Sequence, residues 1–431
     1  MSARTAVGQM SPGAEPVTAT LAAMDTDHRT VLVRCTCHDR PGITTGLLGV
    51  LARAGAELYD MEQVSVRERL TLGLLIGVGS ADDVLKELLF HGWEHGLQLE
   101  FEVVDSDAPP SAPQHRAIVT VIAQTLAPAA LQAVTAAISG AGGNIDRIER
   151  LARYPVVAYE FGVSDGDTAR MRSLLVDASA DHHIDVAVQE ASLERRAKRL
   201  VVLDVDSTLI QNEVIDLLAE EAGCAGQVAD LTAQAMDGAI DFEAALRARV
   251  RLLAGLDVAV FDRVAERIEF TPGARTFVRT LKRLGYTVAI VSGGFSVLTD
   301  RLAAELGIDH TAANDIEIVD GRLTGEVRGD VLDRAGKARV LRQIAESEHI
   351  PLSQTVAVGD GANDLDMLAT AGLGIAFNAK PAVRAHADTA LSVPYLDAIL
   401  FLLGIHRDEI EAADAADPAV PRNRVDQLPP R

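Results

Sequence analysis

The first half of the chain carries one order of strands and helices twice, and this duplication restricts the folds open to it. Alternating β-branched and apolar residues predict strands, and apolar spacing near 3.6 residues predicts helices. The first copy reads strand, helix, strand, strand, helix, strand over Thr30–Thr36, Ile43–Arg53, Glu57–Arg67, Leu70–Val78, Asp82–Trp93 and Gln98–Val104. The second repeats that order over Ala117–Ala123, Ala129–Ser139, Asn144–Arg153, Val156–Val163, Thr168–Ser179 and Ile184–Gln189.

The turn after each first helix fixes the alignment of the two copies. Gly55, Leu58, Met61 and Glu62 match, at a constant offset of 87 residues, Gly142, Ile145, Ile148 and Glu149. Self-similarity at a fixed spacing indicates repeated structural units. We therefore predict two ferredoxin-like βαββαβ domains, at residues 30–107 and 115–192, joined by the linker Ala108–Pro113.

A short turn distinguishes the first copy from the second. His38-Asp39-Arg40-Pro41-Gly42 lies between its first strand and first helix. This turn in this topology resembles the ACT domain, which implies a regulatory module that binds amino acids and pairs its sheet edges with another copy. The alternative is a ferredoxin-like sandwich without a ligand, because a fold does not imply a function. The second copy departs from the pattern with Leu126-Ala127-Pro128.

The second half, residues 199–405, alternates strands with helical segments. Strands are predicted at Leu200–Leu203, Thr287–Val291 and Thr355–Val358, with helices such as Ala274–Leu284 between them. Such alternation predicts an α/β fold with a mainly parallel sheet covered on both faces. The basic run Arg195–Arg199 is expected to be a solvated connector. Residues 1–29 and 406–431 are polar or rich in Ala, Asp and Pro, and we expect both to be disordered tails.

Two carboxylates, Asp204 and Asp206, follow the first of these strands directly. Their like charges repel, and burying either one unpaired would be costly. A cation resolves the conflict, and hard oxygen ligands in an open loop suit Mg²⁺. One carboxylate could then attack phosphorus while the other acts as a general acid. The plainer alternative is an Asp-rich surface turn.

Three further signals follow in order. Ser292-Gly293-Gly294 comes after the second strand, where backbone N–H groups could approach a phosphoryl oxygen. Lys337 stands near a predicted helix start. The segment Gly359–Asp366 follows the third strand and combines glycines, for a tight loop, with carboxylates that could complete a metal shell. Open α/β sheets place ligands at these strand ends.

Together the four signals resemble the haloacid dehalogenase superfamily over about Leu200–Gly404, and within it the phosphoserine phosphatase family. The resemblance implies a Rossmann-like core with Asp204 as nucleophile and Asp206 as acid and base. It implies Mg²⁺ ligands at Asp204, the Asp206 carbonyl and Asp360, with Asp364 as a carboxylate that holds metal-bound water. It assigns phosphate binding to Ser292, Gly293, Lys337 and Asn363.

The interval of about 212–270 is longer than one connecting helix requires. Amphipathic stretches at Val214–Ala222 and Phe242–Leu253 predict a helical cap that excludes water from the site. By the same resemblance, Glu213 would bind a substrate ammonium group and Arg249 its carboxylate, with Met236 and Phe242 as apolar contacts. The alternative makes Glu213 a charge at a helix N-terminus and Arg249 a solvated side chain.

Composition excludes several classes of function. Forty basic and 62 acidic residues give a net charge of −22, which opposes binding to nucleic acid or anionic membranes. No apolar run approaches the roughly 20 residues that span a bilayer. Three cysteines make no disulfide framework, and the Cys35-x-Cys37 pair has no nearby ligand set for a metal. We expect a cytoplasmic protein.

The resemblance implies a phosphatase that converts O-phosphoserine to serine, the last step of serine biosynthesis. Two alternatives stay open: another small-molecule phosphatase of the superfamily, and an amino-acid sensor with a vestigial phosphatase half. The short linker Ala108–Pro113 restricts pairing of the two copies within one chain, so a homodimer is expected. Serine is a candidate ligand near the Asp39–Gly42 turn.

Overall fold

The computed structural model describes residues 29–79, 83–104, 116–236 and 239–420. The chain divides into two compact units, Met1–Ala112 and Pro113–Arg431. The expected tail over residues 1–29, except Arg29, and the linker Ala108–Pro113 lie outside the described residues. No helix in the described part of the chain is long and apolar enough to cross a membrane.

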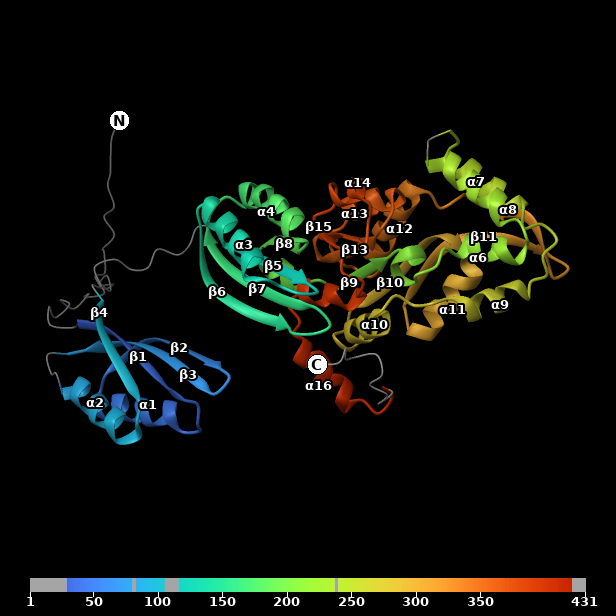
Figure 1. The fold of residues 1–431 in the computed structure, drawn as a ribbon. Helices are drawn as coiled ribbons and strands as arrows, with labels where there is room; N and C mark the ends of the chain where they lie inside the picture. The colour runs from blue at the N-terminus through green and yellow to red at the C-terminus, as the bar shows by residue number, and fades with distance from the viewer. Residues whose placement is uncertain (1–28, 80–82, 105–115, 237–238, 421–431) are drawn as a thin grey trace, which may run out of the picture. The chain divides into compact units, whose positions relative to one another are not determined.

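The first unit is one βαββαβ domain. Its antiparallel sheet has the strand order β2-β3-β1-β4, and helices α1 and α2 lie side by side on one face of it (Figure 1). Its elements are β1 (Arg29–His38), α1 (Ile43–Ala54), β2 (Glu57–Val66), β3 (Arg69–Val78), α2 (Asp83–His95) and β4 (Gln98–Val104). Alternate residues of β1, such as Val31, Val33 and Cys35, are buried against the helices, as the period-two pattern predicts.

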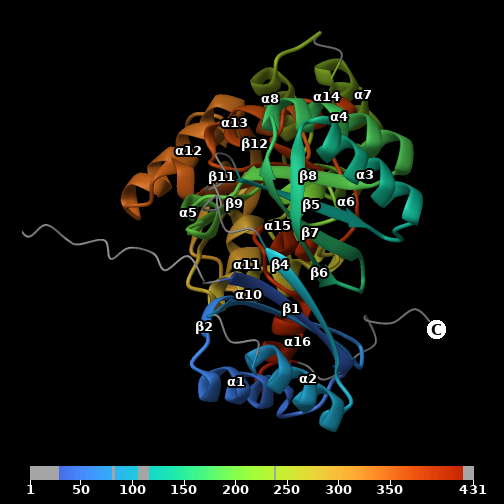
Figure 2. The ribbon, with the colours of Figure 1, turned by 90° about the vertical axis from the view of Figure 1, so that its left-hand side faces the viewer.

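The second unit begins with the other copy of this domain. Its sheet order, β6-β7-β5-β8, is equivalent to that of the first, and α3 and α4 pack together over one face (Figure 2). The elements are β5 (Arg116–Ala123), α3 (Pro128–Gly140), β6 (Gly143–Ala152), β7 (Val157–Asp165), α4 (Thr168–His182) and β8 (Asp185–Glu190). The equivalent order of elements and strands confirms the predicted duplication.

A seven-stranded sheet forms the centre of the second unit, with the order β12-β11-β10-β9-β13-β14-β15. All neighbouring pairs are parallel except β11 with β12. The strands are β9 (Leu200–Leu203), β10 (Thr287–Phe295), β11 (His310–Val319), β12 (Arg322–Arg328), β13 (Thr355–Gly359), β14 (Gly374–Phe377) and β15 (Thr389–Leu391).

Helices cover both faces of this sheet (Figure 1). The central strand β9 is buried throughout: Val201 and Leu203 face one apolar cluster, and Leu200 and Val202 face another. Helices α10 (Ala274–Arg283) and α11 (Ser296–Leu306) contribute to the first cluster, and α12 (Arg334–Ser347) and α13 (Leu365–Thr370) to the second. A strand buried on both faces explains the continuous apolar run in the sequence.

The segment expected to form a cap is helical. Between β9 and α10 it contains α6 (Val214–Glu221), α7 (Ala225–Met236), α8 (Phe242–Arg251) and α9 (Val260–Arg267). Asp241 accepts a hydrogen bond from the Ala244 N–H at 2.7 Å and so caps α8. The remaining short helices are α5 (Leu193–Arg196), α14 (Pro381–Arg384) and α15 (Ile399–Leu402).

The expectation of a disordered C-terminal tail over residues 406–431 is wrong for its first part. Arg407–Ala416 form helix α16. Arg407 is buried and its Nη1 lies 2.8 Å from Asp397 Oδ2, while Asp414 pairs with Arg279 at 2.5 Å. The Asp- and Ala-rich composition therefore conceals a helix that is anchored by partners on other elements. Residues 421–431 of that tail lie outside the described residues.

The basic run Arg195–Arg199 also differs from expectation, because two of its side chains are buried. Arg195 lies 2.5 Å from Glu160 of β7, and Lys198 donates to the Ser353 carbonyl at 2.5 Å. Through these contacts the connector is bound to Glu160 of the second βαββαβ domain and to Ser353 of the α/β domain. Apolar residues of the two, including Leu151 and Leu396, belong to one continuous core cluster.

Candidate active site

The predicted motifs meet at the carboxyl edge of the central sheet. Strand β9 leads to Asp204, β13 leads to Asp360, and Ser292 lies in the last part of β10. Strands β10 and β13 both pair directly with β9 and run parallel to it. Three segments that are far apart in sequence therefore deliver polar side chains to one place.

A buried ion network lies at the centre of this edge. The ammonium group of Lys337 is 2.8 Å from Asp204 Oδ1 and 2.7 Å from Asp364 Oδ1, and all three residues are buried. Burial favours the neutral amine, but the charges of Asp204 and Asp364 outweigh it and raise the pKa of Lys337. Lysine stays charged, and its position is fixed by two carboxylates.

The same carboxylates, with Asp360, form a potential metal site. Oxygens of Asp204, Asp360 and Asp364 all lie within 4.8 Å of one another. Burial raises the pKa of Asp360 to about 6, with a further contribution from the charge of Asp364. One lysine among three carboxylates leaves surplus negative charge, which a hard divalent cation would neutralise. These residues therefore fit a bound metal ion.

Asp206 has different partners from Asp204, although it is only two residues away. Its Oδ1 accepts the Val214 N–H at 2.8 Å and its Oδ2 accepts the Ser292 hydroxyl at 3.0 Å. Burial raises the pKa of Asp206, and these hydrogen bonds act against that shift. The carboxyl group is thus held in place by two hydrogen bonds, and its proton is bound more tightly than that of an exposed aspartic acid.

Glycines are needed where the chain approaches these groups most closely. A Cβ on Gly359 would lie 2.5 Å from the carboxyl carbon of Asp364, and one on Gly294 would lie 3.0 Å from Ser292 Oγ. The Gly361 N–H donates to Asp364 Oδ2 at 3.0 Å and fixes that carboxylate from the other side. The glycines in both motifs are therefore explained by close packing around the site.

A cavity of about 510 Å³ opens above this network and is closed on the other side by the cap. Lining residues come from both the sheet edge and the cap helices: Asp204, Asp206, Gly293, Asp360, Asn363, Glu213, Thr232, Phe242, Leu246 and Arg249. Its size and its combination of apolar and convergent polar groups suit a small ligand.

Glu213 and Arg249 supply opposite charges on the cap side of the cavity. The Ser207 hydroxyl donates to Glu213 Oε1 at 2.8 Å, and Ser207 itself has a left-handed backbone with φ of 56°. Burial, helped by the charge of Asp206, raises the pKa of Glu213 to about 7. Burial lowers the pKa of Arg249.

Arg249 is half-buried, yet it has no ion pair with any carboxylate in the described part of the chain. Its weak contacts, both 3.4 Å long, run to the Ala245 carbonyl and the Thr232 hydroxyl. A half-buried guanidinium without a carboxylate partner has unused capacity for a planar anion. The cavity thus has a cationic group suited to a ligand carboxylate.

Comparisons with known proteins identify the family. A haloacid dehalogenase-like hydrolase model matches residues 201–369, and ACT domain models match residues 29–102 and 115–189. A phosphoserine phosphatase of Streptomyces coelicolor is 52% identical over 398 residues, covering 91% of this chain and 96% of that protein. The chain belongs to the phosphoserine phosphatase family.

A second relative and a solved structure agree with this membership. The phosphoserine phosphatase SerB2 of Mycobacterium tuberculosis is 48% identical over 406 residues, covering 92% of this chain and 98% of that protein. A crystal structure of a HAD family hydrolase from Salmonella enterica aligns with a TM-score of 0.60 at 30% identity, over 67% of this chain and 98% of that one. The predicted fold class is confirmed: two ACT domains precede a haloacid dehalogenase-type domain.

Most of the predicted residues lie together in the structure. Some line the cavity, and others are buried beneath its lining. Asp204, Asp206, Glu213 and Arg249 line the cavity, as do residues such as Gly293, Asp360 and Asn363. Ser292 and Lys337 are buried and contact the lining carboxylates Asp206 and Asp204. The side chain of Met236 lies outside the described residues, whereas Phe242 lines the cavity.

Sequence reasoning missed two residues at this site. Thr208, whose hydroxyl donates to Asp360 Oδ1 at 3.3 Å, lies just after Asp206 in the sequence, where only the two carboxylates had an assigned role. Lys380 lines the cavity after β14, a strand of only four residues that the pattern did not predict. The signal for Lys380 is a polar residue followed by Pro381 at a helix start, immediately after an apolar run.

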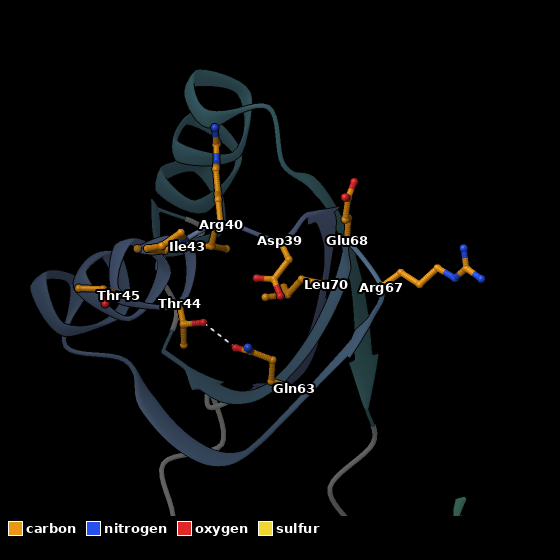
Figure 3. Close-up of a pocket in the computed structure, with 11 residues that line it drawn as sticks. Asp39, Arg40, Ile43, Thr44, Thr45, Gln63, Arg67, Glu68 and Leu70 are labelled. Carbon is orange, nitrogen blue, oxygen red and sulfur yellow. Dashed lines mark hydrogen bonds between the residues drawn. The ribbon is translucent and has the colours of Figure 1, made fainter. Parts of the chain in front are cut away.

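The first ACT domain has a cavity of its own, of about 580 Å³, at the Asp39–Gly42 turn. The carboxylate of Asp39 points into it and accepts the Ser65 hydroxyl at 2.8 Å, and Thr44 donates to Gln63 at 2.7 Å across it (Figure 3). Arg67 points away from the other lining residues (Figure 3). The turn singled out in the sequence therefore borders a space large enough for an amino acid.

Proposed function

We propose that this chain hydrolyses O-phospho-L-serine to L-serine and phosphate, the last step of serine biosynthesis. The observation that carries the proposal is the composition of one cavity. Its floor holds a buried carboxylate paired with lysine, and its cap holds Glu213 and Arg249, one charge for each charged group of an amino acid. Family membership supports the same reaction, since relatives covered almost completely are named phosphoserine phosphatases.

Asp204 is the proposed nucleophile. Its carboxylate oxygen forms a bond to phosphorus as the bond from phosphorus to the serine oxygen breaks, which leaves an aspartyl phosphate. Lys337, at 2.8 Å, and Ser292 stabilise negative charge on the transferred group, with Gly293 and Asn363 at the cavity wall. The buried ion network supports this assignment because it fixes Asp204 before substrate arrives.

Asp206 is the proposed acid and base. It gives its proton to the departing serine oxygen, and it then takes a proton from the water that attacks the aspartyl phosphate. Its raised pKa and its hydrogen bonds to Val214 and Ser292 support the role. The first step leaves Asp206 deprotonated, which is the state that the second step requires.

Mg²⁺ is the proposed cofactor, with ligands from Asp204, Asp360 and the main-chain carbonyl of Asp206. Bound there, it would neutralise charge on the phosphoryl oxygens. Asp364 lies next to these ligands, and its carboxylate is fixed by Lys337 and by the Gly361 N–H. The preference for Mg²⁺ rests on the all-oxygen ligand set.

Phosphate release from O-phosphoserine, measured with and without Mg²⁺, tests the proposed function. We expect turnover that a chelator abolishes and that added Mg²⁺ restores. Asp204→Asn should remove turnover while the protein stays folded, because the amide is nearly isosteric but a poor nucleophile. Turnover of simple phosphate monoesters without turnover of O-phosphoserine would favour another small-molecule phosphatase of the superfamily.

The same proposal extends to the ACT domains and to assembly. Serine would bind in the cavity at Asp39–Gly42, and two chains would pair through ACT sheet edges to form a homodimer in the cytoplasm. The edge strand β2 supports pairing, because it is exposed along its whole length and carries apolar side chains such as Val64 and Val66. Sedimentation as a monomer at micromolar concentration would overturn the dimer.

A further inference from the structure

The charge of the active-site cavity opposes the substrate proposed for it. In the described part of the chain, its charged lining residues include four carboxylates, Asp204, Asp206, Glu213 and Asp360, and only two cations, Arg249 and Lys380. Lys337 is buried and already paired with Asp204 and Asp364. The whole chain carries −22. The proposed Mg²⁺ would offset two of the four carboxylates, and a doubly charged phosphate monoester brings two more negative charges, so further local positive charge favours its approach.

Lys380 is placed to provide that charge at the phosphate end of the cavity. It immediately precedes helix α14, which follows β14. Strand β14 pairs in parallel with β13, and Gly359 and Ala376 are partners in that register. The carboxyl ends of the two strands therefore lie together, one leading to Asp360 and the other to Lys380. Arg249 approaches from the cap instead.

Hydrogen bonding and a proline fix the backbone near Lys380, whereas its side chain has no polar partner among the described residues. The Asn378 N–H donates to the Leu391 carbonyl at 2.8 Å, and Pro381 opens the helix. Within the described residues, the Lys380 ammonium has no hydrogen bond or ion pair, and the residue is exposed. The Lys380 ammonium group is therefore available to bind an anionic ligand in the cavity.

We propose that Lys380 is a further substrate-binding residue, which attracts and binds the phosphate group at the sheet-edge wall of the cavity. This inference rests on the proposed phosphatase function. It differs from the role of Arg249, because Lys380 would act on any phosphate monoester, with or without a carboxylate. It would also bind the product, inorganic phosphate.

The test uses the full chain with Mg²⁺ and two substrates, O-phosphoserine and phenyl phosphate. Lys380→Met keeps the apolar stem and removes the charge, and Lys380→Arg keeps the charge. Arg384→Met is the matched control, since Arg384 is an exposed cation on α14, the helix that Lys380 precedes, and does not line the cavity. The readouts are kcat/KM for each substrate and the inhibition constant of inorganic phosphate.

For Lys380→Met we expect kcat/KM to fall by about threefold to tenfold for both substrates at low salt, as for loss of a steering charge. The inhibition constant of phosphate should rise by a similar factor, while Lys380→Arg stays near the unaltered protein. At about 1 M salt, where the screening length is about 3 Å, the difference should largely disappear. Arg384→Met should change little.

Three results would overturn the inference. A loss confined to O-phosphoserine would mean that Lys380 binds the substrate carboxylate and not its phosphate. An equal loss in Arg384→Met would mean that the effect comes from the net charge of this region and not from Lys380 itself. No change in any readout would leave Lys380 without a role. Failure of the proposed function is separate: the unaltered chain would then hydrolyse phenyl phosphate but not O-phosphoserine, and phenyl phosphate and phosphate inhibition would still test Lys380.

Discussion

Replacing Arg249 with methionine should change the substrate preference of the enzyme rather than its chemistry. Arg249 lines the cavity, and its weak contacts to Ala245 and Thr232 leave the guanidinium free for a ligand carboxylate. A hydrogen bond to a charged group contributes about 1.5–3 kcal/mol, which corresponds to a loss of about 10- to 150-fold. We expect kcat/KM for O-phosphoserine to fall by that factor, and kcat/KM for phenyl phosphate to stay within about threefold.

Stability measurements separate this role from a structural one. Arg249 has no ion pair with a described carboxylate, so its removal breaks none, and the melting temperature should stay nearly constant. Arg247→Met is the control on the same helix. Arg247 does not line the cavity, and it has the ion pair that Arg249 lacks, with Glu243 at 2.8 Å. Its loss should therefore affect stability and not substrate preference. Arg249→Lys should recover only part of the activity, since lysine lacks the planar fork. Equal losses on both substrates, or a marked drop in melting temperature, would instead assign Arg249 a structural role.

Two further predictions concern the cap and the second ACT domain. The pKa of Glu213, about 7, implies that Glu213 gains a proton and loses its charge as the pH falls through 7, so KM for O-phosphoserine relative to phenyl phosphate should rise between pH 8 and pH 6. Glu213→Gln should remove this pH dependence; an unchanged profile would exclude the proposed ammonium contact. A chain that begins at Pro113 should fold and melt cooperatively, whereas one that begins at Arg199 should be strongly destabilised, because Leu151 and Leu396 share one core. Equal melting temperatures of the two would contradict the shared core.

The sequence predicted the parts of the site that depend on strand ends. Asp204, Ser292 and Asp360 each follow or close a strand, and parallel strands bring their carboxyl ends to one edge. The hydrogen bond between Ser292 and Asp206, 86 residues apart in sequence, follows from that topology. Local pattern and topology were sufficient here because each motif lies beside an apolar strand with a clear signal.

The errors come from residues whose state is decided by distant partners. Lys198 is in a basic run that looks solvated, yet it is buried against the carbonyl of Ser353. The sequence of α16 is typical of a disordered tail. The helix is held in place by Arg407 and Asp414, whose partners lie on other elements and are distant in sequence. Composition contains no information about such partners. Lys380 was missed for another reason: the strand before it, β14, is followed by no carboxylate pair and no glycine-rich turn that would mark a site.

Detection of an aspartyl phosphate on Asp204 is the decisive test of the proposed mechanism. The enzyme would be mixed with O-phosphoserine labelled with radioactive phosphorus, quenched in acid within the first turnover and digested. We predict radioactive label on the peptide that contains Asp204. The label should disappear when quenching is delayed, and it should not form in Asp204→Asn. Phosphate released in the first turnover without any labelled peptide, by a protein that hydrolyses O-phosphoserine, would contradict the proposed mechanism.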